Sequence, residues 1–89
     1  MYGMTLIVFF KLDYPSDGSP LVAKSYTIED DDDTYAQISF VMAIMSNIAS
    51  ISKLPEITID HISINSNNPE VYEKLKLYYK DRYVVTSAT

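Results

Sequence analysis

The chain has 89 residues, 47% of them hydrophobic, and a formal net charge of −5 at pH 7. This length is typical of one domain, which we expect over residues 1–89. The absence of cysteine excludes disulfides, thiolate metal ligands and thiol catalysis. An acidic chain lacks the positive charge that displaces counterions from nucleic acids, so we expect no direct binding to nucleic acids or to anionic membranes.

The N-terminus carries no targeting signal that we can identify. Its apolar run has no basic region before it and no small-residue cleavage site after it, so no signal peptide is predicted. No apolar run reaches the roughly 18 residues that a membrane-spanning helix needs. We therefore expect a cytoplasmic protein without a membrane association.

The first third of the chain predicts two strands. Met4–Leu12 is β-branched, aromatic and apolar in both alternating sets, which favours an interior strand covered on both faces for much of its length. Asp13–Pro20 is dense in turn-forming residues and predicts a hairpin loop. Leu21–Ile28 predicts a second, weaker strand.

Thr34–Leu54 is the longest stretch that can form one regular element, and we expect a helix. Either Asp33 or Thr34 can cap it, and Thr34 with Gln37 fits a capping box. Pro55 ends the helix, because the residue before a proline is driven out of the helical region.

The apolar side chains of this helix cover a wide arc. At about 100° per residue they sweep roughly 200° around the axis, more than the stripe of an ordinary surface helix. One face of a sheet cannot cover this arc. We therefore predict that one flank, formed by Ile38, Met42 and Met45, or the other, formed by Phe40 and Ile51, meets a second helix or another subunit.

The stretch after Pro55 predicts a third strand with an irregularity. Ile57 and Ile59 share one phase of the alternation, whereas Ile62 and Ile64 share the other. A two-residue period that changes phase predicts a bulge or bend near Asp60–His61.

The last third predicts a second helix, Pro69–Arg82, capped by Asn68, and a short final strand, Tyr83–Thr86. Glu70 and Lys74 have the spacing of a favourable ion pair. The predicted apolar face consists of Val71, Tyr72, Leu75, Tyr78 and Tyr79. Leu77 lies far from the middle of this face, which makes it a candidate for contact with a partner.

The predicted order is strand, strand, helix, strand, helix, strand. Crossovers between parallel strands are right-handed, so both helices lie on one face of a mixed sheet of about four strands. The expected fold class is therefore an α/β arrangement, specifically an α+β two-layer sandwich. Because both faces of the first strand are apolar, the open face of the sheet is expected to be covered as well, for example by a second subunit.

The acidic run between the second strand and the first helix is the leading candidate site. Its carboxylates could hold Mg²⁺ or Ca²⁺, but the run lacks glycine and the spaced pattern of a calcium loop, so no metal site is assigned. It could also be a solvated helix cap, or a charged docking surface for a basic partner. The candidate partner-binding residues are Glu29, Asp30, Asp31, Asp32, Asp33 and Leu77.

No catalytic site or cofactor is expected. His61 is the only histidine, and its neighbour Asp60 should point to the opposite face of a regular strand unless the bulge redirects it. Ser63 and Ser66 lie in no nucleophile motif. With only two glycines, the chain has no glycine-rich phosphate loop.

Three functional hypotheses follow. The leading one is a small non-enzymatic protein that binds, and thereby inhibits, a basic partner by occupying a nucleic-acid-binding surface as a nucleic-acid mimic. The small size and the glycine-poor composition, rich in Ile, Ser, Asn, Tyr and Asp, resemble those of viral host-takeover proteins, which would place the protein in the host cytoplasm. The alternatives are a self-associating structural or assembly module, such as a homodimer, and a metal-dependent domain that uses the acidic run.

Overall fold

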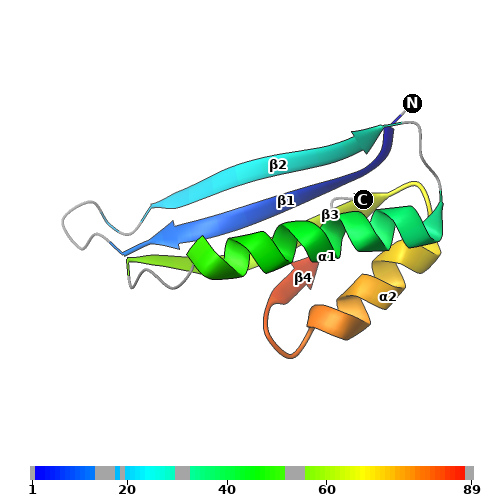
Figure 1. Cartoon of the computed structure of the whole chain (residues 1–89). Coiled ribbons are helices and arrows are strands. Elements are labelled where there is room, and N and C mark those ends of the chain that lie inside the picture. Colours follow the sequence, from blue (N-terminus) through cyan, green and yellow to red (C-terminus); the bar gives the residue numbers. More distant parts are fainter. Residues whose placement is uncertain (1, 14–17, 19, 30–32, 52–55, 88–89) are drawn as a thin grey trace.

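A computed structural model describes residues 2–13, 18, 20–29, 33–51 and 56–87 (Figure 1). The order of its elements is the predicted one. The elements are β1 (Tyr2–Leu12), β2 (Leu21–Glu29), α1 (Thr34–Ile51), β3 (Ile57–Ser66), α2 (Pro69–Tyr79) and β4 (Val84–Thr86).

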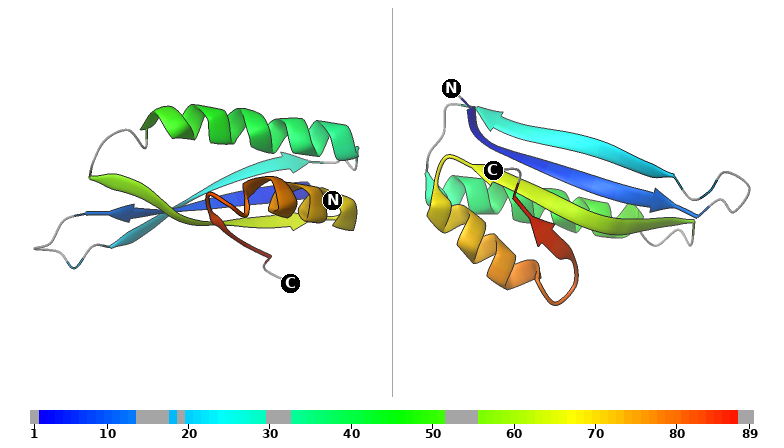
Figure 2. Two further views of the ribbon diagram at one scale, coloured as in Figure 1. Left: turned by 90° about the horizontal axis from the view of Figure 1, so that it is seen from below. Right: turned by 180° about the vertical axis from the view of Figure 1, so that it is seen from behind.

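The strands form one four-stranded mixed sheet in the order β2-β1-β3-β4. β1 is antiparallel to both of its neighbours, and β4 runs parallel to β3. Both helices lie on one face of the sheet, and neither helix crosses the opposite face in the view from behind (Figure 2, right). The two-layer α+β fold is therefore confirmed, and the strand order, which the sequence left open, places β1 in the interior of the sheet.

The hydrophobic core lies between the sheet and the helices. Inward-facing residues of β1 and β3 and the buried stripes of the two helices form it. Its buried members are Met4, Leu6, Val8, Val41, Met45, Ile48, Ile62, Ile64, Val71, Leu75 and Tyr79. Leu6 and Ile62 have no exposed surface, as expected where strand residues alternate between a covered and an uncovered face.

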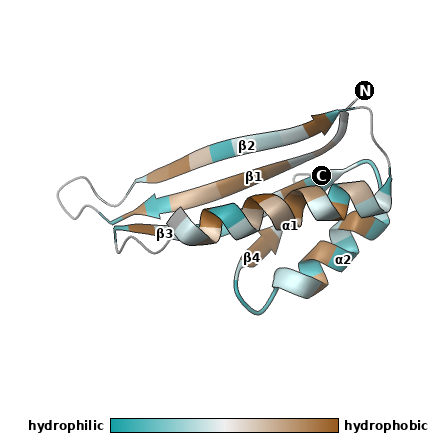
Figure 3. Cartoon of the chain, in the orientation of Figure 1, coloured by the Kyte–Doolittle hydropathy of each residue, from teal (hydrophilic) through white to brown (hydrophobic). Residues whose placement is uncertain are grey.

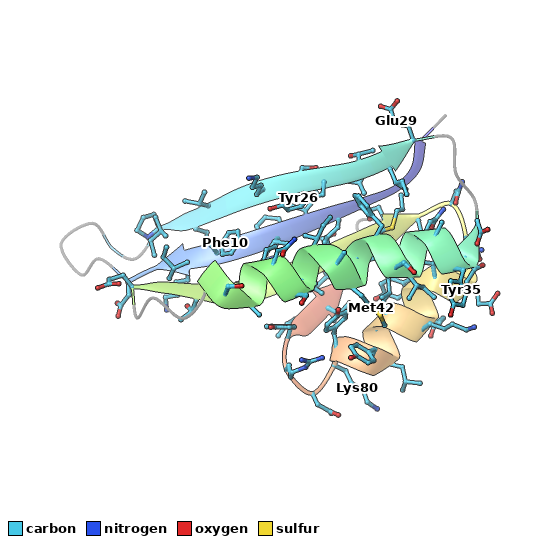
Figure 4. The ribbon with its side chains drawn as sticks, in the orientation of Figure 1. Phe10, Tyr26, Glu29, Tyr35, Met42 and Lys80 are labelled. Atoms are coloured by element: carbon cyan, nitrogen blue, oxygen red, sulfur yellow. The ribbon has the colours of Figure 1, made fainter. Side chains whose placement is uncertain are left out.

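The wide apolar arc of α1 is accommodated as predicted, with one flank toward the second helix. Met42 points into the space between α1 and α2 (Figure 4) and lines hollows with residues of α2. On the other flank, Phe40 is half-buried and packs against the core. The described helix ends at Ile51, whose side chain lies outside the described part of the structure, as do residues 52–54 and the predicted stop at Pro55.

The predicted bulge in β3 is confirmed. Phe9 pairs with His61 and the next residue, Phe10, pairs with Ile59, so Asp60 is the extra residue of the bulge. The extra residue reverses the phase of the alternation, so the two isoleucines before it and the two after it all face the helices. This is why the sequence of β3 fits neither a simple alternation nor a continuous apolar run.

α2 begins as predicted but is shorter. Asn68 Oδ1 accepts the backbone N–H of Glu70 at 3.0 Å, and Pro69 is the first helical residue. The helix ends at Tyr79 rather than Arg82. Tyr78, predicted to lie on the apolar face, is 55% exposed. The buried stripe is narrow, and Tyr78 lies about 60° from its middle at about 100° per residue.

A buried polar clasp joins the start of α1 to the loop between β3 and α2. Gln37 is fully buried: its Nε2 donates to Asn67 Oδ1 at 3.0 Å, and its Oε1 accepts from Ser66 Oγ at 2.6 Å. Asn68 Nδ2 donates to Thr34 Oγ1 at 2.6 Å. The predicted capping box of Thr34 and Gln37 is therefore wrong, because both side chains hold the neighbouring loop instead.

The expected cover over the open face of the sheet, for example by a second subunit, stays a prediction, because no described residue of this chain supplies it. Ile7 and Phe9 point to this face and are half-buried by their neighbours, and no described residue forms a second layer over them. Phe9 stacks on His61 with ring centroids 4.1 Å apart. The pairing places on this face Thr5, Ile7, Phe9, Lys11, Leu21, Ala23, Ser25, Thr27, Thr58, His61, Ser63, Asn65, Val84 and Thr86. Small and hydroxylated side chains dominate it, which explains how it can face solvent.

Candidate interaction surface

The acidic run connects β2 to α1, and the structure describes its two ends. Glu29 is the exposed last residue of β2, and its side chain points away from the sheet (Figure 4). Asp33 caps α1: its Oδ1 accepts the backbone N–H groups of Tyr35 at 2.8 Å and Ala36 at 3.3 Å. Of the two predicted caps, Asp33 is therefore the one used. The candidate residues Asp30, Asp31 and Asp32 lie outside the described residues.

A hollow of about 760 Å³ lies beside Asp33, between the N-terminal halves of the two helices. The residues that line it come from both helices and are Asp33, Thr34, Tyr35, Ile38, Ser39, Met42, Glu70 and Lys74. Tyr35 is 83% exposed, so its ring is available to a partner rather than to the core (Figure 4). The hollow therefore combines an apolar floor with a charged rim.

Three charged side chains line this hollow: Asp33, Glu70 and Lys74. Lys74 Nζ lies 3.0 Å from Glu70 Oε1, one helical turn away, so these two groups offset each other. Asp33 is the third charged residue at the hollow, where its carboxylate caps α1, and the acidic run leads directly into it along the chain.

The structure does not bring Leu77 to this hollow. Leu77 is 66% exposed on α2, as its position in the sequence predicts, but it does not line the hollow with Asp33. Conversely, Tyr35, Ile38 and Met42 line the hollow and were not among the candidate contact residues. The sequence offered one signal for the hollow, which is Tyr35. It is the large aromatic side chain on the side of α1 outside the apolar arc, where the other residues are small or polar: Ser39, Ala43, Ser46, Asn47 and Ser50.

A second cluster, of tyrosines and one arginine, lies at the end of α2. The guanidinium of Arg82 lies 5.4 Å from the ring centroid of Tyr78 and 5.2 Å from that of Tyr79. Tyr79 and Tyr83 have ring centroids 6.0 Å apart. Burial raises the pKa of the Tyr79 hydroxyl, and the neighbouring Tyr78 adds to the rise. The tyrosines thus pack on each other and on Arg82.

Asp60 and His61 form a pair despite being neighbours on a strand. His61 Nδ1 lies 2.7 Å from Asp60 Oδ2, because the bulge turns both side chains toward each other. The ring of His61 is held between this contact and its stack on Phe9. Ser66 donates its hydroxyl to the clasp residue Gln37. These contacts give His61 and Ser66 structural roles.

Within the described residues, no group of three or more His, Cys, Asp or Glu side chains is placed to hold a metal ion. The same part of the chain contains no helix with the length and apolarity needed to span a membrane. Comparisons of the chain with protein-family models, curated proteins and solved structures give no match.

Proposed function

We propose that the protein is a small, acidic, non-enzymatic binding protein that docks on a basic surface of a partner protein. The observation that carries this proposal is the placement of charge. Residues 1–45 hold the whole net charge of −5, mostly in Glu29–Asp33, whereas residues 46–89 are balanced. The described ends of this run, Glu29 and Asp33, are both exposed.

The hollow beside Asp33 supports a docking surface that recognises apolar side chains of the partner as well as its charge. Clustered carboxylates accelerate the encounter with a positive surface, but they are screened by salt and contribute little to residence time. Apolar and aromatic side chains that a partner desolvates contribute most of the affinity of an interface. Tyr35, Ile38 and Met42 offer such side chains directly beside the acidic run.

A basic groove that binds nucleic acid is the kind of partner surface that fits this pattern. The acidic run would occupy the positions of phosphates, and an aliphatic side chain of the partner would enter the hollow. Occupation of the groove would then inhibit binding of the nucleic acid.

A defined probe tests the proposal: a fluorescent arginine-rich peptide with one leucine, titrated with the protein at about 0.1 M and about 1 M salt, where the screening length falls from about 10 to about 3 Å. We expect binding that weakens with salt and is lost when Asp30, Asp31 and Asp32 are changed together to Asn.

The matched control neutralises three acids elsewhere, Glu56→Gln, Glu73→Gln and Asp81→Asn, and so changes the net charge by the same amount. This control should retain most of the binding. Equal losses from the two triple variants would reduce the interaction to unspecific charge attraction and would overturn the proposal, as would unchanged binding by the Asp30, Asp31 and Asp32 variant.

The hollow is tested with Tyr35→Ala, a change at an exposed position that leaves the core intact. We expect the peptide to bind at least about fivefold more weakly, as for the removal of an interface anchor. Leu77→Ala tests the second candidate region. A loss from Leu77→Ala with none from Tyr35→Ala would move the docking surface from the hollow to the outer face of α2.

A further inference from the structure

The two edges of the sheet differ greatly in length. β4 ends the sheet with three residues, Val84–Thr86, whereas β2 ends it with nine, Leu21–Glu29. β2 pairs with β1 on one side only, and no described residue pairs with its outer side (Figure 1). In an antiparallel ladder every second residue of such a strand directs its N–H and C=O outward. A long edge of this kind is a template for another strand unless it is protected.

β2 lacks the usual protection against strand addition. It contains no proline, its only irregularity in pairing with β1 lies at the Tyr2–Met4 end, and its single lysine is Lys24. The ammonium of Lys24 lies 5.5 Å from the ring centroid of its near neighbour Tyr26. The edge is therefore neither interrupted nor covered within the described chain.

We propose that the outer edge of β2 pairs antiparallel with β2 of a second copy of this chain, around a two-fold axis at Ser25. The two four-stranded sheets then join into one continuous sheet with all helices on the same side. The partner surface is thus a second identical edge, and this association is independent of the proposed basic partner.

The sequence of β2 is complementary to itself in this register. Ser25 is the middle residue of the strand, so pairing about it uses all nine residues. The resulting cross-strand pairs are Leu21–Glu29, Val22–Ile28, Ala23–Thr27, Lys24–Tyr26 and Ser25–Ser25. Val22 and Ile28, which lie near the two ends of the strand, come together on the helix side, and the brown segments of β2 in Figure 3 mark these apolar ends. Aliphatic and aromatic pairs opposite each other stabilise a ladder.

Charge and apolar pairing together select this register over its neighbours. Pairing about Lys24 would place two lysines directly opposite each other, which is unfavourable. Pairing about Tyr26 would place Lys24 opposite Ile28 and leave Val22 without a partner in the strand, because β2 ends at Glu29. Only the register about Ser25 keeps like charges apart and retains both Val22–Ile28 pairs. This distinction matters for a chain whose net charge of −5 opposes self-association.

The helix side of β2 also has apolar surface that a second copy would shield. Val22 is 46% exposed, and with Phe10, Leu12, Tyr26 and Ile57 it lines an apolar hollow of about 250 Å³. In the proposed register, Ile28 of the second copy lies directly beside Val22. The exposed apolar end of β2 therefore becomes part of a continuous surface.

Single cysteines in this cysteine-free chain test the register. Cα atoms of directly opposed residues are about 4.5–5.5 Å apart, within the range of about 4.4–6.8 Å that a disulfide bridges. Ser25→Cys should therefore form a covalent dimer on mild oxidation at micromolar concentration. Ala23→Cys is the matched control on the same face: it is opposite Thr27, so the two new thiols are more than about 13 Å apart and should not be linked.

Sedimentation of the unmodified protein should give twice the chain mass of 10.1 kDa. Ser25→Lys should give a folded monomer, with an unchanged circular dichroism spectrum, because it places two lysines at the axis. Val84→Lys, a change at another exposed position on the opposite edge strand, should remain a dimer. A monomeric unmodified protein, equal linkage of the two cysteine variants, or a Val84→Lys variant that alone dissociates would each overturn the proposal.

Discussion

The two faces of β1 lie in different environments, although both are apolar. On the helix side, Leu6 and Val8 have no exposed surface. On the open side, their neighbours Ile7 and Phe9 are only half-buried, although they are equally apolar. The helix side is filled by other elements, whereas among the described residues only the neighbouring strands, with the stack of Phe9 on His61, shield the open side.

This difference shows that an apolar residue in an interior strand is not necessarily fully buried. An apolar residue in an interior strand need not be covered by a second layer, because cross-strand neighbours can remove part of its surface from water. Small, hydroxylated side chains around Ile7 and Phe9 keep the rest of the open face compatible with solvent. The stability of the fold should therefore reside mostly on the helix side.

The largest expected effect comes from truncation on the helix side. Leu6→Ala should lower the free energy of unfolding by about 2–5 kcal/mol, as for other buried leucines. Ile7→Ala, one residue away on the open side, should cost less than half as much. Urea denaturation of both variants measures the difference. Equal costs would mean that the open face is also covered in solution, and the comparison would fail.

The polar clasp on the helix side gives the next largest effect. Gln37→Leu leaves Asn67 Oδ1 and the Ser66 hydroxyl without the partner they have now, which should cost about 1–3 kcal/mol. Asn47→Leu, at an exposed position of the same helix, should change stability by less than about 0.5 kcal/mol. Thermal unfolding compares the two. A neutral Gln37→Leu would show that water readily replaces the clasp.

A double-mutant cycle measures the stack on the open face. Phe9→Leu, His61→Gln and the double variant should reveal a coupling of about 0.5–1.5 kcal/mol, the range of aromatic pairs. If the two single changes add within about 0.3 kcal/mol, the stack contributes nothing beyond burial.

The smallest expected effect is on the pH dependence of stability, through Tyr79 at the end of α2. Burial raises the pKa of Tyr79 in the folded state, so the folded protein retains this proton to higher pH than the unfolded chain does. Stability should therefore fall as pH rises beyond the unfolded pKa of about 10. The stability of the Tyr79→Phe variant should fall less steeply than that of the unmodified protein between about pH 9 and 11. Identical pH profiles would indicate that the Tyr79 hydroxyl reaches water.

Much of the fold follows from local chemistry in the sequence. Asn68 with Pro69 marks the start of α2, and the phase change between Ile59 and Ile62 marks the bulge, since caps and alternation depend on residues close in the chain. The strand order does not follow, because it depends on which distant segments pair. Neither does the role of Gln37, whose partners lie about 30 residues away.

The candidate surface was predictable only in part. The acidic run is visible in the sequence, and Asp33 caps α1 as proposed. The hollow beside it was not visible, because Met42 and Lys74 come from two helices whose relative placement the sequence does not specify. Leu77 was correctly predicted to be exposed, but exposure on α2 does not by itself place it near the acidic run.

The bulge at Asp60 has a consequence for in-frame deletions in the gene. Loss of the Asp60 codon would make β3 a regular strand in which Ile57, Ile59, Ile62 and Ile64 still face the helices, because Asp60 is the one residue without its own partner in the ladder. Loss of the neighbouring Thr58 codon would instead turn Ile57 toward the open face. Within β3, Asp60 is thus the residue whose deletion best preserves the faces to which the four isoleucines point.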